Sequence, residues 1–238
     1  TIVMQTLAQK VQAFVLQGMN PGLELGIRKD LAAGYSWAKD LKGMKIGVSA
    51  PGSSTHMLIN HLLASVGLKQ DDVSIIGVGT GPTAVAAMRS GQIDALSSSE
   101  PVMTLLERSG DIKIVVETVT DKGVRDVFGG SMPAATLYAR LDFIEQNPNT
   151  VQALTNAIVR ALLWLQKSTT EDVLNAVPPE YLLGDRALYA ASFERLRATY
   201  SKDGMIPKKG VDNSYKVLLA HNTAVRRAPV VWINQTYT

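Results

Sequence analysis

The chain has 238 residues, of which 46% are hydrophobic and 19% charged, a composition typical of a globular protein with one large domain or two small ones. Its formal net charge of +3 comes from scattered Lys and Arg residues, too thin a distribution for a nucleic-acid-binding surface. The absence of cysteine excludes disulfides, thiolate metal sites and cysteine nucleophiles, and no window reaches the about 20 apolar residues of a membrane span.

The first 28 residues hold two extended runs, TIVMQTLAQ and LELGIR, with AFVLQGMNPG between them. Both runs predict strands rather than helices. KIGVSA over residues 45–50 predicts a further strand, and a helix is expected to open at Ser53 or Ser54 and to stop at Gly67. Its apolar residues share one stripe, which consists of Ile59, Leu62, Leu63 and Val66.

Strands and helices then alternate up to residue 119. A buried strand is predicted over residues 73–78, further strands over 93–99 and 112–119, and helices over 81–91 and 101–110. Strands separated by helices of about 10 residues imply right-handed crossovers and a mainly parallel sheet. This segment is therefore predicted to be an α/β domain.

The stretch Gly129-Gly130-Ser131-Met132-Pro133 predicts a bend between two parts of the chain, with Met132 lining a cleft beside it. AATLYAR over residues 134–140 predicts a strand, and the chain after residue 140 is predicted to be helical almost to its end. Asn147 or Asn149 is expected to cap the first of these helices. Its apolar stripe consists of Val151, Leu154, Ile158, Leu162 and Leu165, and further helices are predicted over 169–176, 185–199 and 211–221.

Several conspicuous aromatic and histidine residues are interpreted as structural. Trp164 is expected in the core, and Trp232 is expected to pack the C-terminal tail. His61 lies five residues from His56, a spacing that does not put both rings on one helix face, so no metal pair is expected. His221 is expected to interact with the end of its helix.

The strongest candidate for a binding site is the turn after residue 50. Pro51-Gly52 ends the strand, so the free N–H groups of the next helix lie at the carboxyl edge of the sheet, where open α/β sheets bind ligands. The hydroxyl groups of Ser53, Ser54 and Thr55 and a switchable donor on His56 add to this helix end, which suits an anion. The alternative is that Ser53 or Ser54 is a plain N-cap and His56 faces solvent.

The next two strands end in the same way. Gly79-Thr80-Gly81 allows close backbone approach to a ligand, although these glycines can also serve the turn alone. Ala84 replaces the third glycine of a dinucleotide-binding fingerprint, so such a site is not expected. Ser99 and Glu100 follow the third strand as candidate ligand contacts, and Glu100 alternatively caps the helix that begins at Pro101.

Three motifs in this order resemble the bacterial solute-binding proteins of sulfonate, taurine and nitrate importers, a family that also includes thiamine-pyrimidine precursor binders. They are Asp40-Leu41-Lys42-Gly43, Gly91-Gln92-Ile93-Asp94-Ala95 and Glu100-Pro101. The final residues, VVWINQTYT, resemble the end of this family as well.

The resemblance implies an α/β type II periplasmic binding fold, in which two lobes close over a ligand at a two-crossing hinge. The inserted second lobe would span residues 29–132, and the first lobe would consist of 1–28 plus 133–238. The crossings would lie near Leu23 to Arg28 and near Met132 to Leu137. Family members carry further βα units ahead of the point where this chain begins, so we expect the first lobe to be incomplete in it.

The function that the resemblance implies is the substrate-binding component of an ABC importer, which captures a small anion and delivers it to a membrane permease. We therefore expect a monomer without cofactor, metal, nucleic-acid partner or catalysis, located in the periplasm after removal of a signal peptide, or lipid-anchored in a Gram-positive host. No GxSxG or HExxH motif is present to indicate an enzyme. The alternatives are the ligand-sensing domain of a LysR-type regulator and an enzyme similar to pyrimidine-precursor synthases.

Overall fold

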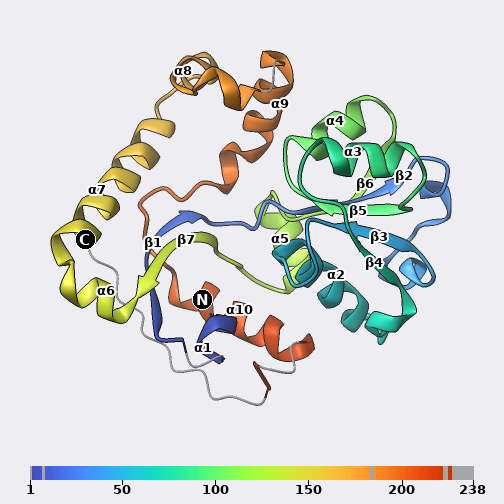
Figure 1. Ribbon diagram of the computed structural model, residues 1–238, viewed down its shortest axis with the longest axis horizontal. Helices are drawn as coiled ribbons and strands as arrows, with labels where there is room; N and C mark the ends of the chain where they lie inside the picture. Colours follow the sequence, from blue (N-terminus) through green and yellow to red (C-terminus); the bar gives the residue numbers. More distant parts are fainter. Residues whose placement is uncertain (1, 7–8, 183–184, 222–224, 227–238) are drawn as a thin grey trace.

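The computed structural model describes residues 2–6, 9–182, 185–221 and 225–226 (Figure 1). A five-stranded sheet has the order β4-β3-β5-β2-β6, and a two-stranded sheet pairs β1 with β7. The large sheet consists of β2 (Glu24–Arg28), β3 (Lys45–Val48), β4 (Ser74–Gly77), β5 (Ala95–Ser98) and β6 (Ile112–Glu117). With its helices α2 (Ser54–Ser65), α3 (Pro82–Arg89), α4 (Val102–Arg108) and α5 (Asp121–Phe128), it forms what we call the five-stranded unit.

The predicted alternation of strands and helices from residue 45 to 119 is confirmed, and so is the α/β fold class. β3 is parallel to β4 and to β5, as predicted. β2 lies between β5 and β6 and is antiparallel to both, so the sheet is mixed rather than built from crossovers alone. The prediction that the strand over 73–78 is buried is wrong: β4 is an edge strand, and its Ser74 and Gly77 are exposed.

The N-terminal run is the second correction. TIVMQTLAQ was expected to form a strand, but residues Ile2–Thr6 form the short helix α1. The strand is instead β1 (Val11–Gly18), in the stretch between the two runs, and it pairs antiparallel with β7 (Ala134–Arg140). Packing decides between the two structures, because Ile2 is buried against Leu218 and Val225 rather than in a sheet.

The remaining helices are α6 (Leu141–Gln146), α7 (Pro148–Leu165), α8 (Thr170–Ala176), α9 (Arg186–Leu196) and α10 (Lys208–His221). Short 3₁₀ turns lie at Ala32–Gly34, Ala38–Leu41, Gln70–Asp72, Pro179–Leu182 and Arg197–Thr199. Helices α7 to α9 project from the two-stranded sheet as an arm, which we call the helical arm, residues 148–196 (Figure 1). α10 ends at His221 and returns to the five-stranded unit, where Val217 joins the hydrophobic core around α2.

The apolar stripe of α7 is only partly buried. Val151 and Leu162 are buried, but Leu154 is exposed and Trp164 is 43% exposed, so the prediction that Trp164 belongs to the core is wrong. α7 packs on β1 with the face that carries Val151, and Trp164 lies off that face. Asn147 occupies the N-cap position, but its side chain donates to the carbonyl of Phe143 instead of capping the helix. Trp232 lies outside the described residues.

Two segments cross between the parts of the chain. The first follows β1: Asn20 donates to the carbonyl of Val119, and the Leu23 N–H donates to the Thr118 hydroxyl. The second follows α5, which ends at Gly129 with a φ of 71°, a left-handed conformation that glycine adopts without strain. Asn213 of α10 donates to the carbonyls of Phe128 and Ser131 on this second crossing. The second crossing reaches Met132, where a crossing was predicted to begin. The first lies ahead of the predicted crossing from Leu23 to Arg28, because residues Glu24–Arg28 form β2 within the five-stranded sheet. The division into lobes at residues 28 and 132 stays a prediction.

Candidate functional site

The candidate site lies at the carboxyl edge of the parallel strands. Because β3, β4 and β5 run in one direction, the turns that follow them meet at the same edge, and each leads into a helix N-terminus. β2 is antiparallel, so its first residue, Glu24, lies at this edge as well, opposite Ser98 on β5 and Glu117 on β6.

The turn after β3 forms a helix start with free donors. Ser53 is the N-cap of α2, with its side chain accepting from the His56 N–H at 3.4 Å, and Ser54 at the first helical position is exposed. Within the described part of the chain, no acceptor faces the backbone N–H of Ser54 or Thr55. The helix therefore presents two unpaired N–H donors and the positive end of its dipole.

Thr55 has a structural role in this turn. Its buried hydroxyl oxygen accepts from the Ser49 N–H at 3.0 Å and lies 2.7 Å from the Ser53 hydroxyl. The Thr55 carbonyl accepts from the hydroxyl of Ser97, which ties α2 to β5. Thr55 thus holds the strand-to-helix turn together from inside, while Ser54 is the hydroxyl on the outside.

Replacing Thr55 by valine should destabilise the fold, because valine keeps the shape but leaves the Ser49 N–H without its acceptor. A lost hydrogen bond at a buried donor costs about 1–3 kcal/mol. Urea denaturation followed by circular dichroism measures this loss. The matched control is Thr150→Val at an exposed position of α7, for which we expect a change below about 0.5 kcal/mol. An equal loss in both variants would contradict the structural role of Thr55.

His56 is held as a neutral imidazole. Its Nδ1 accepts from the Gly52 N–H at 2.9 Å, so the ring proton lies on Nε2. Burial lowers the pKa of His56, which favours this neutral form. Nε2 is buried and faces no acceptor among the described residues.

The turn after β4 carries the second free helix end. Gly79 has a φ of 77°, and a Cβ there would lie 2.8 Å from the Thr83 hydroxyl, so the position favours glycine. Its N–H donates to the Ser49 carbonyl, which joins the two turns side by side. Gly81 is the N-cap of α3 and has no side chain to cap it, and no acceptor in the described chain faces the N–H groups of Thr80 and Gly81.

The turn after β5 differs, because it already contains an anion. The Glu100 carboxylate accepts from the Thr104 N–H at 3.0 Å and from the Thr104 hydroxyl at 2.8 Å, and so caps α4. The Glu117 carboxylate accepts from the N–H groups of Val119 and Thr120 at the turn into α5. Among the described residues, four helices start at this edge, and α2 and α3 are the two that start without a carboxylate of their own.

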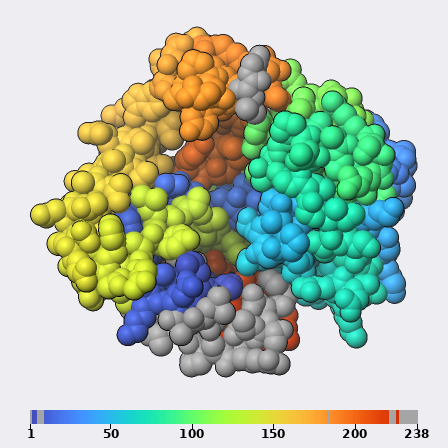
Figure 2. All heavy atoms as spheres, viewed as in Figure 1, coloured from blue at the N-terminus to red at the C-terminus, as the bar shows by residue number. Residues whose placement is uncertain are grey.

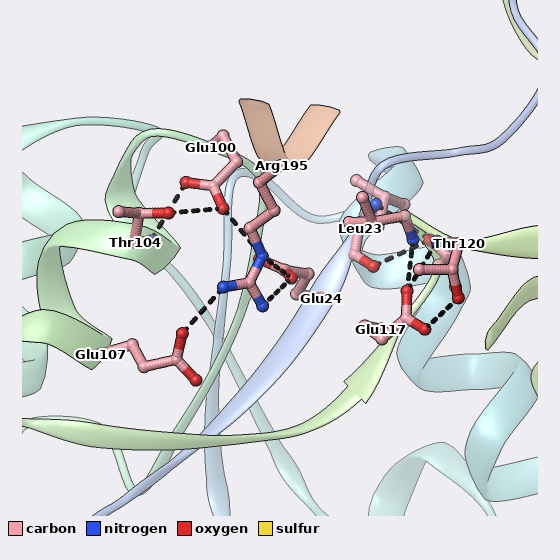
Figure 3. Close-up of polar contacts among 10 residues, drawn as sticks. Leu23, Glu24, Glu100, Thr104, Glu107, Glu117, Thr120 and Arg195 are labelled. Atoms are coloured by element: carbon pink, nitrogen blue, oxygen red, sulfur yellow. Dashed lines mark hydrogen bonds and ion pairs between the residues drawn. The ribbon is translucent and has the colours of Figure 1, made fainter. Parts of the chain in front are cut away.

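Glu100 also belongs to a cluster that the sequence did not reveal (Figure 3). Arg195, near the end of α9, forms ion pairs with Glu24 at 2.6 Å, Glu100 at 3.2 Å and Glu107 at 2.8 Å. The side chains of Glu24 and Glu100 are 0% and 1% exposed, and that of Arg195 is 29% exposed. We call these four residues the Arg195 cluster.

The Arg195 cluster contains three carboxyl groups and only one guanidinium. Burial raises the pKa of Glu24 to about 7, although the Arg195 charge opposes this shift; Glu100 and Glu107 add to it by repulsion. One carboxylate oxygen of Glu24, Oε2, is buried and faces no donor in the described chain. A proton on Glu24 is therefore bound more tightly than by a carboxylate in water.

The other predicted site residues are placed as follows. Ser99 is half-buried at the end of β5, and Met132 is half-buried on the second crossing and packs against the core of the five-stranded unit. Neither contacts Ser53 to His56 in any described hydrogen bond or ion pair. His61 is structural, as predicted: its Nε2 lies 2.8 Å from the Val127 carbonyl and its ring packs against Phe128.

Figure 2 shows that this face of the molecule is hollowed between the helical arm and the five-stranded unit. The light-blue segment near residue 50 borders the hollow, so the start of α2 lies at its rim. In the part of the chain that the structure describes, no group of three or more acidic, histidine or cysteine residues has the arrangement of a metal site. Over the same residues, no helix combines the length and apolar character needed to cross a bilayer.

Comparison with known proteins gives matches over most of the chain. The sequence profile of the NMT1-like family matches residues 6–177. The nitrate/nitrite binding protein NrtA of Nostoc sp. is 27% identical over 158 residues, which cover 65% of this chain and 33% of that protein. A putative binding protein of Brucella abortus is 33% identical over 129 residues, which cover 54% of this chain and 38% of that protein. The matched region thus spans only about a third of these curated relatives.

Solved structures give the fold. A Bordetella bronchiseptica protein is 48% identical, with a TM-score of 0.87 over 95% of this chain and 76% of that one. The periplasmic aliphatic sulphonate binding protein SsuA of Escherichia coli is 18% identical, with a TM-score of 0.68 over 94% of this chain and 72% of that one. The desulfurization enzyme DszB, 18% identical, matches with a TM-score of 0.55 over 93% of this chain and 75% of that one. The predicted type II periplasmic binding fold is confirmed.

Proposed function

The chain belongs to the NMT1-like family, and from this premise we propose that it is the solute-binding part of an ABC importer that captures a small anion at the carboxyl edge of the five-stranded sheet. Sulfonates, nitrate and small carboxylates are the proposed ligand class. The observation that carries the proposal is the pair of helix starts, α2 and α3, that lie side by side with free N–H donors and without a carboxylate of their own.

The electrostatics of this edge favour a compact anion. Backbone N–H groups at a helix N-terminus bind sulfonate, nitrate or carboxylate oxygens without requiring a charged side chain. The exposed hydroxyl groups of Ser54 and Thr80 add donors at the same place, and neither they nor the neutral His56 ring bring a negative charge. Glu100 is excluded from this anion subsite by its own charge, because it already occupies the start of α4 and pairs with Arg195.

The proposed mechanism is capture by closure of two lobes. We take the five-stranded unit as the second lobe, with its first boundary moved from residue 28 to just before β2 so that the sheet stays whole. The parts of the chain on either side of this unit form the first lobe, with Met132 at the bend between the two. The anion binds at the α2 and α3 starts, the opposite lobe covers it, and the closed form docks on a membrane permease, with the protein in the periplasm or anchored outside the membrane. The proposal contains no chemical step, and the chain has no cysteine to supply a thiolate nucleophile.

A thermal-shift screen of the intact protein tests the function. The panel consists of ethanesulfonate, taurine, nitrate, acetate and a pyrimidine, each at several concentrations. A ligand at about 100 times its Kd adds about 2.7 kcal/mol of stability, which raises the Tm of a protein of this size by roughly 5–10 °C. We expect one anion class to give this rise. A response to the pyrimidine alone would contradict the proposed anion class.

Ser54 provides a test of the site itself. We expect Ser54→Ala to weaken binding of the responding anion about tenfold, since a hydrogen bond to a charged group contributes about 1.5–3 kcal/mol and the backbone donors remain. Isothermal titration calorimetry measures the change. The control is Ser74→Ala, an equally exposed serine at the opposite edge of the sheet, where β4 begins. Unchanged affinity in Ser54→Ala would remove this side chain from the site.

A further inference from the structure

The Arg195 cluster joins two parts of the molecule that are far apart in the sequence. Arg195 comes from α9 of the helical arm, whereas its three carboxylates come from β2, from the turn after β5 and from α4. Glu24 and Arg195 are separated by 171 residues. The cluster is thus a contact between the arm and the five-stranded unit, and Figure 3 shows the Arg195 guanidinium directed into the three carboxylates.

The neighbouring arginine holds α9 to the rest of the arm. Arg197 donates to the carbonyls of Leu165 and Ser168, which lie at the end of α7 and just after it. Its guanidinium also lies 4.6 Å from the centre of the Phe193 ring. Two arginines near the end of α9 therefore contact different parts of the molecule: Arg197, just after the helix, contacts the end of α7, and Arg195 contacts the five-stranded unit.

The segment that follows the C-terminal end of α9 is hydrogen-bonded to the end of β1 and to the residue after it, at the first crossing. The Met19 N–H donates to the Thr199 carbonyl at 2.6 Å, and the Ser201 N–H donates to the Gln17 carbonyl at 2.7 Å. These bonds and the antiparallel bridge between Gly18 and Tyr200 anchor the segment after α9 to the end of β1. The Arg195 cluster lies on the other side of the first crossing, at the start of β2.

We propose that Arg195 is a latch that fastens the helical arm to the five-stranded unit, and that protonation of Glu24 strengthens this latch. With all groups ionised, one guanidinium faces three carboxylates, two of them buried. Repulsion between the carboxylates is then relieved only when the arm moves away and water enters. A proton on Glu24 removes this repulsion while leaving Arg195 paired with Glu100 and Glu107.

The groups that face Glu24 support this direction. Arg195 faces it from α9, Glu100 from the turn before α4 and Glu107 from α4. Glu117, its register partner on β6, directs its carboxylate to Val119 and Thr120 instead. Burial raises the pKa of Glu24 to about 7 in the latched arrangement. Release hydrates Glu24, which lowers its pKa, and removes the Arg195 charge, which raises it. Because burial is the larger of the two effects, acid favours the latched arrangement and alkali favours release.

Distance measurements between spin labels test the latch. The chain has no cysteine, so Gln92→Cys on the five-stranded unit and Ala161→Cys on α7 provide two unique labelling sites, both at exposed positions. Pulsed dipolar spectroscopy is run without ligand at about pH 4 and about pH 8.5, on either side of the expected titration. The latch does not depend on the proposed solute-binding role, and neither does this experiment.

We expect the wild type to show one narrow distance distribution in acid and a second, longer population in alkali. The ratio of the two should change by on the order of a hundredfold across the full titration, as a pKa difference of 2–3 units requires. Glu24→Gln should give the same distribution at both pH values, with the short distance dominant. Arg195→Met should populate the longer distance at both pH values.

The control is Arg89→Met, which breaks an ion pair of similar length, Arg89 to Asp111 at 2.9 Å, that lies within the five-stranded unit. Its distributions should match the wild type. Circular dichroism confirms folding of each variant; should Arg195→Met not fold, Arg195→Met with Glu24→Gln removes one buried carboxylate and takes its place, with the longer distance expected at both pH values. A wild-type distribution that does not move with pH, a pH shift retained in Glu24→Gln, or arginine variants that match the wild type would each overturn the latch.

Discussion

Replacing Arg195 by methionine should lower the free energy of unfolding by about 3–5 kcal/mol at neutral pH, the cost of removing one partner from a buried ion pair. The side chains of Glu24 and Glu100 are 0% and 1% exposed, so in the latched arrangement both carboxylates lose their cation while they are out of contact with water. Methionine fills much of the same volume, which leaves the lost charge as the main change. Urea denaturation followed by circular dichroism measures the difference.

Two further variants separate charge from packing. Arg195→Met combined with Glu24→Gln should recover part of the loss, because one of the stranded carboxylates is then neutral. Arg89→Met, which breaks a pair with side chains 49% and 25% exposed, should cost less than about 1 kcal/mol. If Arg195→Met were no more costly than Arg89→Met, the cluster would not contribute to stability as its burial implies.

The pH dependence of stability should change when Glu24 is replaced by glutamine. In the wild type, burial raises the pKa of Glu24 from 4.5 to about 7, so the folded state holds its proton more tightly than the unfolded state. The stability that the folded state gains from this proton is fully present below about pH 4.5 and is lost as the pH rises through about 7. At 1.36 kcal/mol per pKa unit, the loss is about 3 kcal/mol.

Glu24→Gln cannot titrate, so the variant should gain about 3 kcal/mol relative to the wild type between about pH 4.5 and about pH 8. Urea denaturation at a series of pH values measures this relative gain. Glu145→Gln on α6, an exposed carboxylate, is the matched control and should follow the wild-type curve. A constant difference between Glu24→Gln and the wild type over this range would show that Glu24 does not titrate as its burial indicates.

The local periodic pattern was sufficient to predict the five-stranded unit from residue 45 onward. Its strands and helices are short, regular and separated by glycine or proline, as at Gly67 and Pro82, so each element is marked where it begins or ends. The position of β2 was not predictable in this way. A five-residue strand between β5 and β6 depends on partners about 70 to 90 residues away, and no local pattern specifies them.

The predictions of an N-terminal strand and of a buried Trp164 were wrong for a related reason. An apolar run such as TIVMQTLAQ is compatible with a helix or a strand, and contacts with α10 decide for α1. Trp164 follows the buried Leu162 by two positions, which on a helix lie on different faces. Its apolar character indicated burial, but the part of α7 that packs on β1 does not include it.

The candidate site was predictable where it depends on one turn and not where it depends on assembly. Hydroxyl residues after Pro51-Gly52 marked the start of α2, and the structure places Ser53 there as the N-cap. The sequence also allowed Glu100 to cap the next helix, and the structure shows this contact. Arg195 had no local signal, because its three partners come from elements that lie together only in the folded chain.

The most direct test of anion capture at the starts of α2 and α3 is a titration followed by nuclear magnetic resonance. The backbone amide resonances of the intact protein are recorded as the anion with the largest thermal shift is added. We predict that the amides of Ser54, Thr55, Thr80 and Gly81 shift first and most, since these are the free donors at the starts of α2 and α3. Saturable shifts confined to other parts of the chain, or no shift with any anion of the panel, would contradict anion capture at this edge of the sheet.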